Sequence, residues 1–214
     1  MLLHGHASWR DESRVGAQWR GLARQFRRQV KTDDVTIDRV LPGITAPLRA
    51  RLRRHPKLRR EQIAGAERCY RAAIPSAFRI GDLLVNTRRA AFRITEIRLS
   101  ATWIACDDWQ DDYRELGVGV CRFDLALTDG VLSETWTPIA TASLHAISRR
   151  LERGQDASHQ ALVTDLACLA TPPAAANHIS TADGAWAGAM VATTLRRGDK
   201  VMAFNARTWF DPRE

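Results

Sequence analysis

The sequence has no run of about 18 uncharged apolar residues, the minimum for a membrane-spanning helix, so we expect no membrane span. It has four cysteines among 214 residues, and no two of them form a CxxC pair. This spacing implies neither a zinc knuckle nor a dense disulfide framework. The opening residues lack the basic start, apolar stretch and cleavage site of a secretory signal. We therefore expect a cytoplasmic protein, and export by a route that needs no cleavable signal stays open.

Motifs that mark common enzyme classes are also missing. There is no GxSxG, no Walker phosphate loop and no GxGxxG, so the sequence gives no support to a serine hydrolase or a nucleotide-binding enzyme. Residues 107–115 hold five acidic side chains, and oxygen-rich clusters can bind Mg²⁺ or Ca²⁺. Without the glycine and spacing of an EF-hand loop, the stretch is more typical of a solvated turn. We expect no resident metal and no cofactor.

Acidic residues are scarce in the first third of the chain. Residues 1–75 contain 17 Lys and Arg against 7 Asp and Glu, whereas the rest of the chain contains 15 against 17. The net charge of +8 therefore comes entirely from the first third. Such a basic region attracts polyanions, so nucleic acid, an anionic membrane surface and an acidic protein are the candidate partners. A solvated, arginine-rich helix face explains the same charge equally well.

Periodicity divides the chain in the same place. Apolar residues recur every three or four positions in residues 15–30, which predicts an amphipathic helix with Arg20, Arg24, Arg27 and Arg28 outside its apolar stripe. Two prolines and a glycine in residues 41–47 predict a break, and helical spacing then resumes with an interruption at Pro56. We expect a basic helical region of about three helices over residues 1–75.

The remaining residues, 76–214, read as an α+β domain. Runs rich in β-branched and aromatic residues between 78 and 139 predict four or five antiparallel strands in a meander, with Asp129-Gly130 as a hairpin turn. Helices are expected over 142–153 and 157–170, followed by a hairpin that turns at Gly198-Asp199. The predicted fold class is thus α+β, with basic N-terminal helices, a mainly antiparallel sheet, two helices and a C-terminal β-hairpin.

The segment 143–154, SLHAISRRLERG, carries the candidate chemistry. As a helix it places Leu144, Ile147 and Leu151 on the core side, with Thr141 or Ser143 as N-cap. A neighbouring polar sector holds the side chains that interest us, which are His145, Ser148, Arg149, Glu152 and, at its edge, Arg153. Unpaired backbone N–H groups in the first turn favour an anion beside His145. The same pattern is typical of an ordinary exposed helix face.

Those residue types match what RNA cleavage without a metal requires. A base must take the proton of the 2′-hydroxyl, an acid must supply one to the leaving oxygen, and cations must hold the extra phosphoryl charge. His145 or Glu152 would be the base, or His145 the acid. Arg149 and Arg153 would form the phosphate clamp, because guanidinium binds phosphate oxygens bidentately.

The string His145-Ala146-x-x-Arg149-x-x-x-Arg153, followed by a second helix and a hairpin that ends in Arg207-Thr208-Trp209-Phe210, resembles small bacterial toxin RNases of the barnase/EndoU/RelE-like superfamily. The resemblance covers about the last 75 residues. It implies metal-independent RNA cleavage by His145, Arg149 and Arg153 with Thr208 or Arg207, and an acidic immunity protein as partner. The sequence departs from the family in having the long strand region 78–137 before the helix.

Two functions are therefore expected from this sequence. The first is a toxin-like ribonuclease that uses the His/Arg helix. The alternative is a non-catalytic nucleic-acid-binding or adaptor protein that acts through the basic N-terminal helices, with Arg20, Arg24, Arg27 and Arg28, and also Arg207, as contacts to nucleic acid.

Overall fold

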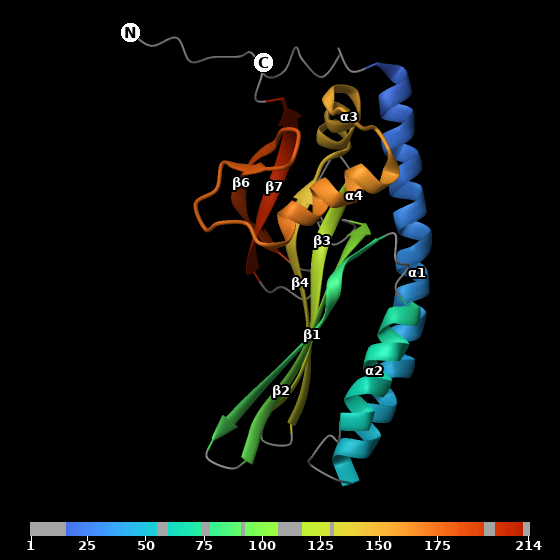
Figure 1. Ribbon diagram of the computed structural model, residues 1–214, viewed down its shortest axis with the longest axis vertical. Coiled ribbons are helices and arrows are strands. Elements are labelled where there is room, and N and C mark those ends of the chain that lie inside the picture. Colours follow the sequence, from blue (N-terminus) through green and yellow to red (C-terminus); the bar gives the residue numbers. More distant parts are fainter. Residues whose placement is uncertain are drawn as a thin grey trace.

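The computed structural model describes residues 16–54, 60–73, 78–90, 93–106, 117–128, 131–194 and 200–211. Along these ranges the chain forms four α-helices and seven strands, with the basic helices first and the strands and remaining helices after them (Figure 1). The predicted α+β fold class is confirmed. The acidic run 107–115, Pro56 and the turn dipeptides Asp129-Gly130 and Gly198-Asp199 lie outside the described residues.

The first helix differs from the prediction. Helix α1 spans Ala17–Arg54 without a break and contains both Pro42 and Pro47, and α2 follows at Arg60–Ala73. The predicted break at residues 41–47 was therefore wrong. Each proline removes a backbone donor and crowds the preceding turn, but neither has to end a helix that packing holds in place. Helix α1 packs against α2 along its second half and against the sheet and α3 along its first half (Figure 1).

The sheet begins as the predicted meander. Strands β1 (Arg79–Ala90), β2 (Arg93–Cys106), β3 (Val118–Thr128) and β4 (Val131–Ala142) pair antiparallel in chain order. Residues 93–106 form one continuous strand, β2, so the meander has four members, within the predicted four or five. The expected hairpin of β3 and β4 is confirmed by the register from Val118 with Ala142 to Thr128 with Val131.

The chain then crosses over through helices and returns to the same sheet. Helix α3 covers Leu144–Arg153, α4 covers His159–Ala167, and a 3₁₀ turn continues to Ala170. Strands β5 (His178–Ser180), β6 (Ala185–Thr194) and β7 (Lys200–Phe210) complete the order β1-β2-β3-β4-β7-β6-β5. The predicted C-terminal hairpin is confirmed as β6 and β7, and β7 joins β4 as the parallel pair of this sheet.

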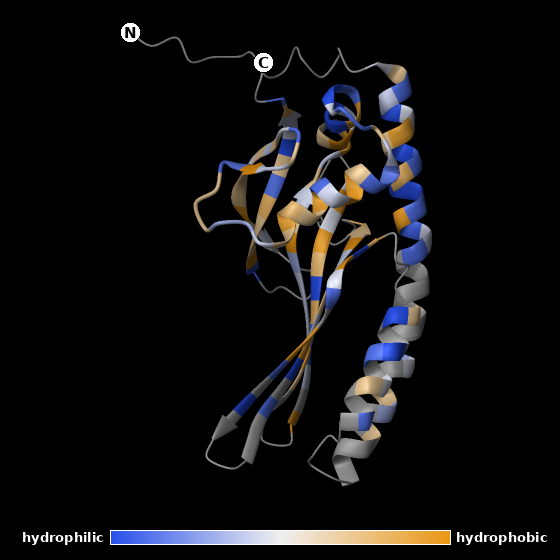
Figure 2. Cartoon of the chain, in the orientation of Figure 1, coloured by the Kyte–Doolittle hydropathy of each residue, from blue (hydrophilic) through white to orange (hydrophobic). Residues whose placement is uncertain are grey.

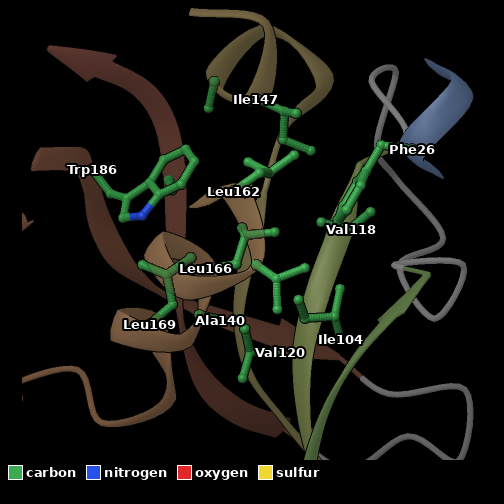
Figure 3. Close-up of a cluster of buried hydrophobic side chains, with 14 of the residues drawn as sticks. Phe26, Ile104, Val118, Val120, Ala140, Ile147, Leu162, Leu166, Leu169 and Trp186 are labelled. Carbon is green, nitrogen blue, oxygen red and sulfur yellow. The ribbon is translucent and has the colours of Figure 1, made fainter. Parts of the chain in front are cut away.

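One hydrophobic core joins the helices to the sheet. Ala23, Phe26 and Val30 of α1 pack in the same buried cluster as the sheet residue Ile104 and the helix residue Ile147. Figure 3 shows Phe26 at one side of this cluster and Trp186 at the other, with side chains of α3, α4 and the sheet between them. Trp186 and Trp209 are fully buried in it, so core packing is their role. The basic N-terminal region and the α+β region thus share a core.

Hydrophilic and hydrophobic residues alternate along the first half of α1, as expected for a helix with one face on a core (Figure 2). Of the helices in the described ranges, none is both long enough and apolar enough to cross a membrane.

Candidate functional site

The start of α3 is fixed to the last strand. Ser143 is the N-cap: its side chain accepts a hydrogen bond from the Ala146 N–H at 3.1 Å, which confirms one of the two expected caps. The Ser143 backbone N–H donates to the Ala206 carbonyl at 3.1 Å, and its hydroxyl donates to the Arg207 carbonyl at 3.3 Å. The first turn of α3, which contains His145, therefore lies beside residues 206–208 of β7. The structure brings together the two segments that the sequence nominated.

The polar sector of α3 is less open than the sequence predicts. Ser148 and Arg149 are only 1% and 4% exposed. The Ser148 hydroxyl donates back to the Leu144 carbonyl at 2.7 Å, and Arg149 Nη1 donates to Glu152 Oε2 at 2.9 Å. Figure 1 shows the reason, because α3 lies between β7 and α1 and packs against both. The predicted solvent exposure of Arg149 was therefore wrong, and its guanidinium is engaged by a carboxylate of its own helix.

The other nominated residues of this region are partly accessible. His145, Glu152 and Arg153 on α3, and Thr208 on β7, are half-buried, whereas Arg207 is exposed. Arg149, Arg153 and His145 all have further partners within the fold. The backbone segments that carry His145 and Thr208 therefore lie close together. Arg149, between His145 and Arg153 on the helix, already has a carboxylate partner.

Sequence reasoning missed Arg150, the neighbour of Arg149. Its side chain is 1% exposed, and its Nε lies 2.5 Å from Asp165 Oδ2 of α4. The same guanidinium donates to the Asp156 carbonyl and lies 5.9 Å from the Trp209 ring centroid. Burial raises the pKa of the Asp165 carboxyl, and the hydrogen bond and charge of Arg150 act against that rise. The helical spacing could have predicted this burial, because at 100° per residue Arg150 falls between Ala146 and Ile147 in the apolar sector.

The basic residues of α1 fall into two groups. Arg20, Arg24 and Arg28 are exposed and follow one another every four residues, a rise of about 6 Å per step. In the described part of the chain none of the three makes a salt bridge. We call these three residues the arginine row. Helix α1, which carries the row, lies along one edge of the molecule in Figure 1.

Arg27 is not part of the arginine row, because its side chain contacts the sheet. It is half-buried, and its Nε donates to the Gly117 carbonyl at 3.0 Å. Gly117 precedes β3, and a Cβ there would overlap the Ala142 carbonyl, so the two strand ends approach closely at this point. The prediction of Arg27 as a nucleic-acid contact needs a free guanidinium edge, and this hydrogen bond already uses part of it to tie α1 to the sheet.

His159, the first residue of α4, lies inside an aromatic cluster. Its ring centroid is 5.0 Å from that of Phe26 on α1 and 5.2 Å from that of Phe78, which precedes β1. Its Nε2 is buried and has no hydrogen-bond partner in the described residues. Burial lowers the pKa of the His159 imidazole, and the negative charge of Asp33 on α1 acts in the opposite direction. This histidine therefore supports the contact of α1 with α4 in its neutral form.

Comparison with known proteins adds no relative: no family model, curated protein or solved structure matches the chain. Within the described ranges, no group of three or more His, Cys, Asp or Glu side chains is placed to hold a metal ion. The candidate functional groups of the described residues therefore lie at the start of α3 and on the exposed side of α1.

Proposed function

We propose that this protein binds nucleic acid through the arginine row of α1. The observation that carries the proposal is the exposure of Arg20, Arg24 and Arg28 in one line, one helical turn apart, without an acidic partner in the described residues. Arginine pairs bidentately with phosphate oxygens, and a line of such groups neutralises successive phosphates and releases their counterions. The rigid attachment of α1 to the core keeps the row in place without cost at the moment of binding.

The test is a salt titration of nucleic-acid binding. A variant with glutamine at Arg20, Arg24 and Arg28 is compared with wild type by fluorescence anisotropy between about 50 and about 200 mM salt, and the slope of log affinity against log salt is expected to shrink by about 0.9 for each arginine that contacts a duplex. The matched control carries glutamine at Arg88, Arg98 and Arg122. These arginines of the sheet are also exposed, by 80%, 50% and 48%, but each pairs with a carboxylate of a neighbouring residue.

The control should retain the wild-type affinity and slope apart from a small uniform change, because its arginines already pair with carboxylates. The two triple variants lose the same charge, so a larger loss in the α1 variant reports the position of its arginines. Equal weakening by both triple variants would mean that only net charge matters, and the proposal would fail. Unchanged binding in the α1 variant would also overturn it. Circular dichroism of each variant checks that the helices are retained.

A second candidate, metal-independent RNA cleavage, is favoured by one observation. The hydrogen bonds of Ser143 to the Ala206 and Arg207 carbonyls hold the turn with His145 beside the Arg207-Thr208 segment, as the resemblance to toxin RNases requires. The pairing of Arg149 with Glu152 counts against a clamp that includes Arg149, and leaves Arg153 and Arg207 as the cations for that role. An acidic immunity partner belongs to this candidate alone.

Its test is a gel of total RNA incubated in EDTA with wild type and with His145→Ala. Discrete cleavage by wild type and none by the variant supports the candidate. Cleavage by both proteins, or by neither, removes this candidate.

A further inference from the structure

Gly21, like Gly43, lies in the interior of α1 at a position where no contact among the described residues requires glycine. Glycine is among the least favourable residues in a helix interior, second only to proline. Where the fold needs glycine, an added Cβ collides with its surroundings, as at Gly117, Gly184 and Gly188. A Cβ built at Gly21 would meet no heavy atom of the described chain within 4 Å, and Gly21 is exposed. Its missing side chain therefore leaves space on the outside of the helix.

That space lies at the middle of the exposed side of α1. At about 100° per residue, Gly21 points away from the buried side chains of Ala23, Phe26 and Val30. The arginine row borders it on one side. On the other side stands a second line of exposed polar residues, which are Gln18, Gln25 and Gln29. The surface is thus cationic along one edge, open at the centre, and lined by uncharged carboxamides and the exposed Leu22 along the other edge.

This arrangement matches the major groove of duplex DNA. An α-helix with its side chains is about 10–12 Å across, and the groove is about 12 Å wide and 8.5 Å deep. Arginines along one edge would contact the phosphates of one strand. Glutamine carboxamides can donate to and accept from adenine in a bidentate pair. Glycine at the centre would let the base edges approach the helix backbone closely. The major groove of duplex RNA is too deep and narrow for such a helix.

We infer that the first half of α1 binds in the major groove of duplex DNA, with Gly21 at the point of closest approach. The inference rests on the proposed function, because it names the nucleic acid that the arginine row would hold. It adds two requirements that simple phosphate binding does not have. Duplex DNA must be bound more tightly than duplex RNA or single strands, and side-chain volume at residue 21 must weaken binding.

The experiment separates these requirements from helix stability. Gly21→Leu adds a good helix former that has neither charge nor a hydrogen-bonding group, and it is expected to raise the melting temperature while weakening binding to a short DNA duplex by about tenfold, the loss of one bidentate base contact. The control is Gly43→Leu. Gly43 is exposed in the same helix, also has open space over its Cα, and lies beyond the arginine row. This control should gain stability and keep the wild-type affinity.

Three results distinguish the inference from the proposed function. If Gly21→Leu binds duplex DNA as tightly as wild type while the arginine-row variant binds poorly, the groove contact is overturned and binding by the row stands. Duplex RNA or single-stranded DNA bound as tightly as duplex DNA also overturns the groove contact alone. If the arginine-row variant binds like wild type, the proposed function fails and the inference fails with it.

Discussion

Arg150 of α3 and Asp165 of α4 form a buried ion pair, with 2.5 Å between Nε and Oδ2 and side-chain exposures of 1% and 5%. The Trp186 indole N–H donates to the Asp165 carbonyl at 2.8 Å, so the pair lies at a junction of both helices with the C-terminal hairpin. A buried pair of this kind adds little net stability, but loss of one partner leaves a charge without compensation.

Arg150→Met should therefore destabilise the protein by about 3–5 kcal/mol. The double variant Arg150→Met/Asp165→Leu should recover most of that loss, because both charges are then absent. Urea denaturation followed by tryptophan fluorescence measures both, since Trp186 and Trp209 lie in this cluster. A single variant as stable as wild type would contradict the burial of the pair.

The burial of Arg149 leads to a separate prediction about the stability of the protein. Because its guanidinium is buried and hydrogen-bonded to Glu152, Arg149→Met should lower the free energy of unfolding by about 1.5–3 kcal/mol, the range for a hydrogen bond to a charged group. Arg153→Met, at a half-buried position one turn later, is the matched control and should cost less. Equal stability of the two variants would show that Arg149 is not held by the fold. Any ribonuclease assay of Arg149 variants must be read beside this measurement.

The burial of His159 leads us to expect that the stability of the protein depends on pH. Burial between Phe26 and Phe78 lowers the folded-state pKa of His159 below the unfolded value of about 6.5, so the neutral ring is favoured by folding. Its contribution is complete above that value and is lost as pH falls from it towards the folded-state pKa. Between pH 7.5 and 5.5 the free energy of unfolding should therefore fall more steeply in wild type than in His159→Gln.

The control for this prediction is His178→Gln, because His178 is exposed. That variant should follow the wild-type pH profile. Asp33 is present in all three proteins, but the charge of His159 also lowers the pKa of the Asp33 carboxyl, so the difference between wild type and His159→Gln measures these two groups together. A His159→Gln profile as steep as the wild-type profile would show that another group is responsible.

Local signals explain which parts of the fold the sequence could predict. The alternation between residues 78 and 139, the cap at Ser143 and the apolar residues Ile147 and Leu151 each depend on neighbours a few positions away, and each is found in the structure. The continuity of α1 through Pro42 and Pro47 is different, because packing overrides the local preference for a break.

The candidate site was harder to predict because it too depends on packing between segments that are distant in the sequence. Arg149 is buried in a helix that packs against α1 and β7, two elements distant in the sequence, and nothing in residues 143–154 encodes that packing. The partner of Arg150 is likewise on another helix. For the arginines of α1, helical spacing alone did not separate Arg27, which reaches Gly117, from its exposed neighbours.

Arg24 and Arg27 should therefore respond to substitution in opposite ways. Arg24 is exposed in the arginine row, so Arg24→Gln should reduce the salt slope of nucleic-acid binding by about 0.9 and leave stability within about 0.5 kcal/mol of wild type. Arg27 donates to the Gly117 carbonyl, so Arg27→Gln should cost about 1–3 kcal/mol of stability with a smaller effect on the slope. Thermal denaturation and anisotropy titrations on the same two proteins give both quantities. A larger loss of affinity in Arg27→Gln than in Arg24→Gln would place the contact surface on the side of α1 that faces β3, because that is the side on which Arg27 reaches Gly117.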